Sequence, residues 1–392
     1  MPQPMSPDAG APRTRIFLAC SGLGTIHRGY ESFFRASYDA LRRQQGLDVR
    51  LFKGSGPASE GERALRHLPR DGAMARAIGA LVQRGPYVVE QVSFAASLIP
   101  HVLREKPDVI FFCDPAIGKV LGRWRQSHGG TYRLVFHNSG PIAPPFPWFD
   151  HVQQVTPTAH DDAMAAGEPA SRHTLLPCAL DIGSAPVRVT GAERAARRRA
   201  LGFPETRPVI LSVGALNRHH KRMDYLIREV ASLPEPRPHL VMLGQEEADT
   251  PAVRAMAHLL LGAHGVSIRT VGQDEVDEYY RAADVFALAS LREGFGLGYA
   301  EALAHGLPCI AHDFAVARFV LGEEGIYADL RQPGALAEAL RCALASESTD
   351  AVIQRRHAGV AQRFGWHELA PRYARMLRES MHQSQRRMVP ST

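Results

Sequence analysis

Two glutamates, Glu293 and Glu301, bracket the glycine-rich stretch EGFGLGYAE and are the residues of this 392-residue sequence best placed for chemistry. An apolar run from Val285 to Ala289 precedes the stretch, and a short helical pattern follows it. Three glycines within five residues let the backbone approach a ligand closely, and the free amides at a helix start attract an anion. Carboxylates repel a bare phosphate, so we expect these two to accept hydrogen bonds from hydroxyl groups. A nucleotide-sugar, with phosphate between hydroxyl-bearing ends, satisfies both expectations, and a solvated loop is the alternative.

A cation-rich loop follows another apolar run, Val209 to Val213, and precedes an apolar-periodic helical pattern that starts near Met223. The loop has five consecutive basic residues, from Arg218 to Arg222. Cations at the start of a helix oppose its macrodipole, so the cluster indicates an anionic ligand. Lys221 is one of only four lysines in the chain, and a compact ammonium at such a turn suits a diphosphate.

The first half of the chain has a weaker phosphate motif. Gly22 and Gly24 suggest a dinucleotide-binding turn, but His27 stands where the third glycine of that motif belongs, and no acidic residue convincingly follows the second apolar run. We therefore reject an NAD site. Gly29, before the first helical pattern, can instead bring backbone amides toward a phosphate held by the opposite half of the chain.

His137 ends the apolar run LVFH and opens the polar loop NSGP. A histidine at this point can hydrogen-bond a sugar hydroxyl or help to stabilise charge in a cleft. Position alone weighs that role evenly against an ordinary, satisfied polar side chain. His219, His220 and His312 have no partners at metal-ligand spacing, so we expect no metal site.

A parallel α/β scaffold must position these residues, because short apolar runs alternate with longer helical patterns along the chain. The runs are residues 16–19, 49–52, 109–112, 134–136, 209–213, 240–243, 267–271, 285–288 and 309–311. Most of them end in polar, glycine-bearing loops, and ligands of parallel sheets bind at the carboxyl ends of strands. Gly214 ends one run, and we expect contacts to a nucleotide base near Gly244 and Gln245 and near Gly272 and Gln273.

The length predicts two domains, and a charged, glycine- and proline-bearing break at residues 182–208 separates the two alternating halves. We place an N-terminal, acceptor-binding Rossmann-like domain at residues 1–185 and a C-terminal, donor-binding Rossmann-like domain at residues 186–365. Residues 366–392 would form a helix that crosses back to the first domain, followed by a polar tail. The ligand site is expected in the cleft between the two sheets.

The composition of the chain and the positions of its cysteines indicate the cellular compartment in which we expect the protein. No run of about 18 apolar residues appears, so we expect no transmembrane helix. The polar, proline-rich N-terminus has no secretory signal pattern. The five cysteines are scattered, mostly in or beside apolar runs, which favours reduced, buried thiols in a cytoplasmic protein.

The net charge of +6 is no indication of nucleic acid, because no recognition motif accompanies it, so we expect no nucleic-acid partner. A basic surface can also favour anionic substrates or an anionic membrane face. Residues 54–100 mix basic and apolar helical segments. We favour packing of these segments on the sheet, with peripheral contact at the inner membrane face as the alternative.

These motifs resemble those of glycosyltransferase family 4, the retaining transferases of the two-domain GT-B fold. The resemblance is strongest from about Val209 to Leu330 and weaker but continuous through the first half. It implies that Glu293 contacts the donor sugar and Glu301 the ribose, and that Lys221 contacts the phosphates. Further matches are His137 near the donor sugar, the backbone of Gly294, Phe295, Gly296 and Leu297 around the diphosphate and sugar, Gly29 with Tyr30 and Glu31, and the turn LPCALDI.

The resemblance implies a retaining hexosyltransferase that needs neither a metal nor a cofactor and uses a UDP- or GDP-linked sugar as donor. The acceptor stays open among saccharides, lipid-linked acceptors and small natural products. No carboxylate is well placed as a nucleophile, so we expect the acceptor to attack on the face that the phosphate leaves.

Ala215 departs from the family pattern, because the family usually has arginine there, which joins the lysine in neutralising the leaving diphosphate. Arg218, three residues on, is our candidate substitute. Arg222 also stands where the family usually has glycine. Two alternatives stay open: a catalytically silent relative that binds a nucleotide-sugar or serves as a partner subunit, and a nucleotide-sugar epimerase of the same fold.

Overall fold

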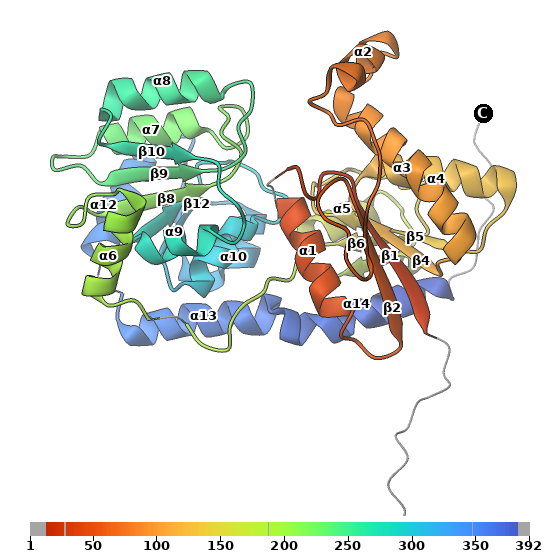
Figure 1. Cartoon of the computed structure of the whole chain (residues 1–392). Coiled ribbons are helices and arrows are strands. Elements are labelled where there is room, and N and C mark those ends of the chain that lie inside the picture. Colours follow the sequence, from red (N-terminus) through yellow and green to blue (C-terminus); the bar gives the residue numbers. More distant parts are fainter. Residues whose placement is uncertain (1–12, 27–28, 187, 347, 383–392) are drawn as a thin grey trace, which may run out of the picture.

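The computed structural model describes residues 13–26, 29–186, 188–346 and 348–382, which form two α/β domains side by side (Figure 1). His27, the N-terminal residues 1–12 in which we predicted no secretory signal, and the predicted polar tail at 383–392 lie outside the described residues.

The N-terminal sheet spans residues 14–175. Its strands are β1 (Thr14–Cys20), β2 (Leu47–Lys53), β3 (Glu62–Ala64), β4 (Val109–Phe112), β5 (Arg133–Asn138), β6 (His151–Gln154) and β7 (His173–Leu175). They are parallel and lie in the order β3-β2-β1-β4-β5-β6-β7. The central strand β4 (VIFF) is buried along its whole length, as expected for a parallel sheet covered on both faces.

The C-terminal sheet spans residues 209–328 and repeats this winding. Its strands are β8 (Val209–Val213), β9 (His239–Leu243), β10 (Val266–Arg269), β11 (Val285–Ala287), β12 (Cys309–His312) and β13 (Gly325–Ala328). They are parallel in the order β10-β9-β8-β11-β12-β13. The strand order therefore reverses between β8 and β11, and the loops that follow these two strands carry Lys221 and Glu293. A reversal of this kind opens a crevice for ligands at the carboxyl ends of the strands.

Helices cover both sheets. The N-terminal domain has α1 (Gly29–Leu41), α2 (Ala73–Leu81), α3 (Pro86–Glu105), α4 (Pro115–His128), α5 (Pro157–Ala165) and the 3-10 turn η1 (Ala170–Arg172). The second half of the chain has α6 (Gly191–Leu201), α7 (Met223–Ala231), α8 (Thr250–Leu261), α9 (Val276–Ala282), α10 (Leu297–Ala304), α11 (Ala315–Leu321), the 3-10 turn η2 (Gly322–Glu324), α12 (Ala335–Ala345), α13 (Asp350–Phe364) and α14 (Trp366–Met381).

The last helix, α14, lies against the first domain, where it packs on α1, β4 and β5 (Figure 1). The rings of Trp366 and Tyr373 stand 5.8 and 6.0 Å from the ring of Phe33 on α1. The predicted domain boundary at 185/186 falls between the two sheets, and the backbone crosses from the C-terminal to the N-terminal domain again near Gly365.

Each of the nine apolar runs overlaps a strand, which confirms the parallel α/β prediction. The expectation of buried thiols is confirmed for Cys20, Cys113, Cys178 and Cys309, but Cys342 on α12 is exposed. All five thiols are free. The exposed Cys342 follows from the amphipathic register of α12, whose buried face is formed by Leu336, Ala339, Leu340 and Ala343.

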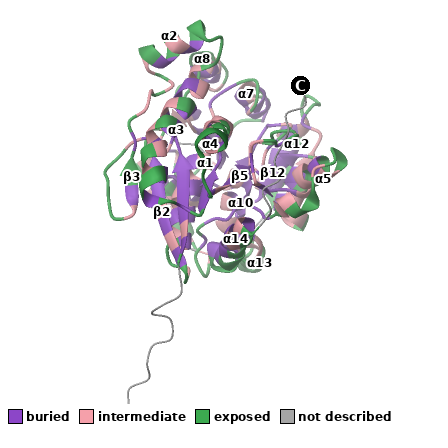
Figure 2. Ribbon diagram, turned by 90° about the vertical axis from the view of Figure 1, so that its right-hand side faces the viewer, coloured by how far each residue is buried: buried purple, intermediate pink, exposed green. Residues whose placement is uncertain are grey.

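Residues 54–100 pack on the sheet only in part, and their alternative contact with a membrane stays a prediction. Helix α3 packs on the sheet through Phe94 and Leu98, which are fully buried. Helix α2 stands away from the sheet, and Figure 2 shows it as a largely exposed projection at the top of the molecule. Met74, Leu81 and Val82 on and directly after α2 are 62, 83 and 52% exposed.

Candidate active site

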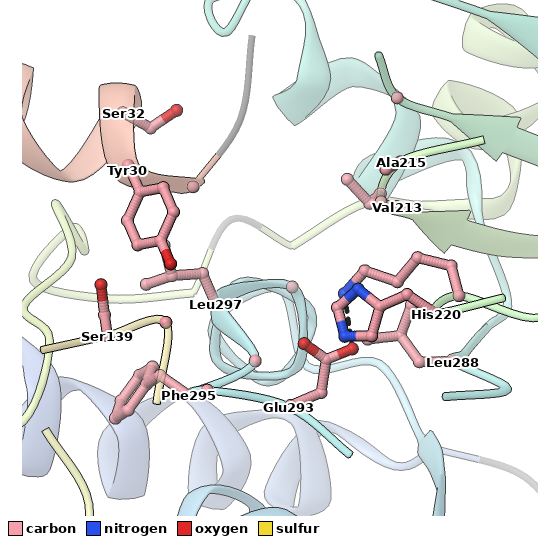
Figure 3. Close-up of a pocket in the computed structure, with 18 of the residues that line it drawn as sticks. Tyr30, Ser32, Ser139, Val213, Ala215, His220, Leu288, Glu293, Phe295 and Leu297 are labelled. Atoms are coloured by element: carbon pink, nitrogen blue, oxygen red, sulfur yellow. Dashed lines mark hydrogen bonds and ion pairs between the residues drawn. The ribbon is translucent and has the colours of Figure 1, made fainter. Parts of the chain in front are cut away.

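A cavity of about 480 Å³ lies between the two domains, bordered by loops at the carboxyl ends of strands from both sheets. In Figure 3, Tyr30 and Ser139 of the N-terminal domain face Ala215 and His220 of the C-terminal domain across it. The volume is in the range of roughly 300–1,000 Å³ that is usual for small-molecule sites.

Most of the predicted site residues come together here. Those that line the cavity are Gly29, His137, Gly214, Lys221, Gly244, Gln273, Glu293, Gly294, Phe295, Gly296, Leu297 and Glu301. Arg218, Gln245 and Gly272 do not line it. Gly272 borders a neighbouring cavity of about 580 Å³, whose wall also includes Gln273 and Glu301.

Lys221 and Glu293 form a direct ion pair in the wall of the cavity, with the Lys221 Nζ 2.5 Å from the Glu293 Oε1. The two side chains are only 13 and 6% exposed. Ser290 Oγ donates a second hydrogen bond to the same carboxylate oxygen, at 2.6 Å. Burial alone would raise the pKa of Glu293, but the Lys221 charge and the hydrogen bonds from Lys221 and Ser290 outweigh it and lower the pKa. The carboxylate is therefore ionised and oriented.

The loop after β8 is shaped so that Lys221 reaches this point. A Cβ atom at Gly214 would lie 2.7 Å from the Cε of Lys221, so glycine is needed where the lysine stem crosses. The buried Asn217 side chain accepts hydrogen bonds from the backbone N–H groups of His220 and Lys221, at 3.0 and 2.8 Å. Its Nδ2 donates to the Glu247 carboxylate at 2.9 Å.

The start of α10 forms the adjoining wall. Gly296, directly before the helix, has a φ of 83°, a left-handed conformation that favours glycine. Gly296, Leu297 and Gly298 border the cavity, so the unpaired amides of the first helical turn lie at its wall. Glu301, one turn later, accepts a hydrogen bond from the Tyr280 hydroxyl at 2.7 Å. Burial raises the pKa of Glu301 despite that bond.

His137 closes the cavity from the N-terminal domain. The side chain is almost fully buried, and its ring stacks on Phe33 at a centroid distance of 4.1 Å. Burial lowers the pKa of His137 to about 4, and a hydrogen bond to Gln153 offsets this only in part. The imidazole is therefore neutral near pH 7. Of the two roles that we considered for it, hydrogen bonding to a hydroxyl fits this state, and a cationic role does not.

The position of Arg218 does not favour our prediction that this residue replaces the missing arginine. Its guanidinium lies 3.6 Å from the Asp249 carboxylate, and its backbone N–H donates to the same side chain at 3.2 Å. The residue is exposed and absent from the cavity wall. Arg292, which precedes Glu293, does line the cavity, and its side chain has no ion pair or hydrogen bond to another described residue.

The backbone conformation of Arg222 is one that glycine adopts easily, which fits the glycine found here in the family pattern. Its φ is 50°, in the left-handed region, at the residue that caps the N-terminus of α7. The guanidinium compensates for this strain by donating to the carbonyls of Ala289 and Leu330, at 3.2 and 2.8 Å, and by lying over the Tyr225 ring at 4.3 Å. The Arg222 side chain therefore stabilises the fold, and we assign contacts with the ligand to neighbouring residues.

Three residues that support the site were not singled out from the sequence: Asn217, Ser290 and Gln153. Asn217 had a usable signal, because asparagine in a polar loop commonly bonds the backbone a few residues on. Gln153 had none, since its partners His137 and Tyr373 lie on another strand and on α14. Ser290 bonds Glu293, only three residues on, but a serine in a loop is too common to single out.

The two domains touch at the rim of the cavity. Ser32 Oγ on α1 hydrogen-bonds Gln273 Oε1 of the C-terminal domain at 2.7 Å. A Cβ atom at Gly294 would lie 1.8 Å from the carbonyl oxygen of Ser139, so only glycine permits this approach of the two backbones. The two domains are therefore in direct contact beside the cavity.

Within the described part of the chain, no group of three or more His, Cys, Asp and Glu side chains is arranged to hold a metal ion. No helix in these same ranges has the length and apolar character needed to span a bilayer.

The chain is similar to known proteins in sequence and in fold. Residues 193–358 match the family model of the glycosyl transferases group 1. A D-inositol 3-phosphate glycosyltransferase of Xylanimonas cellulosilytica is 34% identical over 200 residues, which cover 49% of this chain and 47% of that protein. One from Geodermatophilus obscurus is 30% identical over 244 residues, or 58% and 52% of the two chains. The chain thus spans about half the length of these curated relatives.

Solved structures share the fold over nearly the whole chain. Sucrose-phosphate synthase from Thermosynechococcus elongatus superposes with a TM-score of 0.75 at 20% identity, covering 95% of this chain and all of the other. Anabaena HepE in complex with UDP-glucose gives a TM-score of 0.73 at 16% identity, covering 93% and 100%. These findings confirm the predicted GT-B fold and the resemblance on which it rested. Residues 193–358 of the chain thus resemble the group 1 glycosyl transferases, and the chain has the GT-B fold.

Proposed function

We propose that this protein is a retaining glycosyltransferase that moves a sugar from a nucleotide diphosphate-sugar to an acceptor hydroxyl without a metal ion. The observation that carries the proposal is the Lys221–Glu293 pair, which lies in the cavity wall beside the first turn of α10. A cation and free helix amides suit a diphosphate, and the carboxylates of Glu293 and Glu301 suit the hydroxyls of the sugar and the ribose.

The chemistry follows from where charge develops. As the bond between sugar and phosphate breaks, the leaving nucleoside diphosphate gains negative charge, which Lys221 and the α10 amides are already oriented to stabilise. Glu293 is held by Lys221 and Ser290, so it orients hydroxyls and is not offered as a nucleophile. The acceptor then attacks on the face that the phosphate leaves, and the phosphate oxygen takes the acceptor proton, which gives retention.

We assign the second cation at the diphosphate to Arg292. Lys221 shares its charge with Glu293, and Arg218 is engaged by Asp249. We expect Arg292→Ala to lower turnover by roughly a hundredfold, the usual effect of removing one charge contact to a transition state. Arg341→Ala, which removes an exposed ion pair with Glu338 on α12, controls for the loss of a surface arginine. A large loss in Arg218→Ala with none in Arg292→Ala would reverse the assignment.

The donor class can be proposed more narrowly than the acceptor class. Because the solved HepE complex holds UDP-glucose, UDP-sugars are the first donors to test, followed by GDP-sugars. Base contacts are proposed along Gly244, Gln245, Gly272 and Gln273, at the ends of β9 and β10. The acceptor class stays open among saccharides, lipid-linked acceptors and small natural products, and D-inositol 3-phosphate joins the screen because the curated relatives are named for it.

We also propose a cytoplasmic protein whose helix α2 makes peripheral contact with an anionic membrane face. Residues 63–84 carry five arginines against one acidic residue, Asp71. Met74, Leu81 and Val82 are exposed among them. Apolar side chains flanked by cations favour the headgroup region of an anionic bilayer.

The central experiment incubates the protein with UDP- and GDP-sugars, with and without the acceptor panel, and identifies the products by mass spectrometry and NMR. Transfer with an unchanged anomeric configuration, undiminished by EDTA, is the expected result. Inversion would overturn the retaining mechanism, and loss of turnover in EDTA would overturn metal independence.

Ala215 favours one rival, a nucleotide-sugar-binding relative or partner subunit that does no chemistry. Binding of a donor without turnover, with every acceptor tested, would establish that rival. Isomerised donor in the absence of any acceptor would instead establish the epimerase alternative.

A further inference from the structure

The amide of Gln153 on β6 has only one possible orientation. Its Nε2 lies 2.7 Å from the carbonyl oxygen of Leu176. A carbonyl oxygen accepts hydrogen bonds and cannot donate, so the Gln153 atom that faces it must be the NH₂ nitrogen. The second hydrogen of that NH₂ group points to the hydroxyl of Tyr373 on α14, at 2.6 Å. Tyr373 in turn donates its own proton to the carbonyl of Pro177 at 2.7 Å.

This orientation determines which nitrogen of His137 carries a proton. With both amide hydrogens of Gln153 used, its Oε1 is the atom that faces His137 Nδ1, at 2.9 Å. An amide oxygen accepts and cannot donate, so Nδ1 must carry the hydrogen. Because a neutral imidazole has only one N–H, Nε2 is left with an unshared electron pair.

All members of this chain of hydrogen bonds are buried, so water does not compete with them. Gln153 and Tyr373 are fully buried and His137 is nearly so. Residues 137 and 153 are also direct partners in the register of β5 and β6, which sets their side chains next to each other. Nε2 lies 3.9 Å from the Cys178 thiol, and both residues border the cavity.

We infer that Gln153 and Tyr373 are positioning residues that lock His137 with Nε2 as a hydrogen-bond acceptor, so that the site selects donor sugars with a free hydroxyl at that point. The inference rests on the proposed function for its ligand but not for the state of the histidine. A sugar that lacks this hydroxyl, or carries only an acceptor there, would leave the buried Nε2 with only the weak thiol donor of Cys178 as a partner.

The first test needs no ligand. In protein labelled with ¹⁵N-histidine, long-range ¹H–¹⁵N spectra near pH 7 should show His137 as a neutral ring protonated at Nδ1, assigned by its loss in His137→Gln. Gln153→Met removes the acceptor, so His137 should populate the Nε2–H form. Gln154→Met is the matched control, because Gln154 is the next residue of β6, is equally buried, and bonds Asn138 in place of His137. An Nε2 proton in the wild type, or an unchanged tautomer in Gln153→Met, would overturn the inference.

The second test measures what the lock does for the ligand. Calorimetry compares UDP-glucose with UDP, and their affinity ratio isolates the sugar. Gln153→Met should reduce this ratio by about tenfold while leaving UDP affinity unchanged, because UDP lacks the hydroxyl in question. A merely structural role would weaken both ligands equally, as would be seen in Gln154→Met. If the wild type binds neither UDP nor GDP compounds, the proposed function fails, while the spectra still decide the tautomer.

Discussion

At the scale of single residues, the ion pair between Lys221 and Glu293 has both of its side chains buried in the cavity wall. Lys221→Ala or Glu293→Gln should each reduce the free energy of unfolding by about 3–5 kcal/mol, since each leaves a buried charge without its partner. Each should also lower turnover by roughly a hundredfold. Urea unfolding and initial rates measure the two effects separately.

The double variant Lys221→Met/Glu293→Gln is the informative control. It removes both charges together, so stability should return toward that of the wild type while turnover stays low. A double variant with full activity would show that the pair serves only the fold.

At the same scale, the sequence allowed the residues with unusual local chemistry to be predicted. Lys221 and Glu293 were recognisable because a lysine-poor chain places a lysine in a cation-rich loop, and because a carboxylate borders a glycine-rich bend. Arg218, our candidate substitute for the missing arginine, does not line the cavity, since closeness in sequence to Ala215 does not determine where a turning loop directs a side chain. Arg292 comes from the loop after β11, the strand beside β8, and only the sheet order brings it near.

At the scale of elements, the side-chain contacts of Arg222 at the start of α7 offset the strain of its own backbone conformation. Arg222 holds a left-handed φ of 50°. Arg222→Ala and Arg222→Gly both lose the bonds to Ala289 and Leu330, but only alanine keeps the conformational penalty. Arg222→Gly should therefore be more stable than Arg222→Ala by about 1 kcal/mol in urea unfolding. The reverse order would mean that the loop changes conformation when the arginine is lost.

The proposed membrane contact of helix α2 can be tested by substitution of its exposed apolar residues. Leu81→Glu with Val82→Glu should abolish sedimentation with vesicles rich in phosphatidylglycerol, because it places two anions on the apolar face. Thermal stability should be unchanged, since both side chains are exposed. Leu259→Glu on α8, an equally exposed leucine in the other domain, is the matched control and should still bind. If the wild-type protein does not bind these vesicles, the proposed membrane contact is wrong.

The elements missed from the sequence share a physical cause. Strand β6 reads HVQQ and is buried along its whole length, and its three polar side chains bond His137, Asn138 and Thr174. Apolar periodicity cannot reveal a strand whose core contacts are hydrogen bonds. Strands β3 and β7 have three residues each, too short to show any period. The long apolar strands were predicted because burial on both faces leaves a continuous hydrophobic run.

For the whole molecule, the approach of the two domains depends on Gly294. A methyl group there would meet the Ser139 carbonyl at 1.8 Å, so Gly294→Ala should hold the cleft open. We expect a larger radius of gyration by small-angle scattering and a loss on the order of a hundredfold in kcat/KM, since a displacement of about 1 Å is enough for that. Gly359→Ala on α13, with open space around it, should leave both unchanged. Normal kinetics in Gly294→Ala would mean that the loop of Ser139 yields instead.

Each domain also contains a buried neutral histidine, His137 in the first and His239 in the second. Burial lowers the pKa of both to about 4. The unfolded chain, with a histidine pKa near 6.5, binds more protons between these values, so stability should fall as the pH drops from about 6.5 toward 4. The loss is up to about 3 kcal/mol per histidine. Urea unfolding between about pH 7 and pH 5 should show a shallower dependence in His239→Gln, and an unchanged slope would contradict the assignment.

The return of α14 to the first domain has a consequence for synthesis on the ribosome. Phe33 and Phe111 of the first domain, and the amide of Gln153 beside them, are covered or bonded by Tyr373, which is translated after the entire second domain. A nascent chain that has completed β1 to β7 therefore still presents an open apolar face and an unanchored glutamine. We therefore expect its first domain to complete its core only after residues 366–381 have been translated. Translation of the last helix then covers this apolar face and supplies the Tyr373 hydroxyl that anchors the Gln153 amide beside His137.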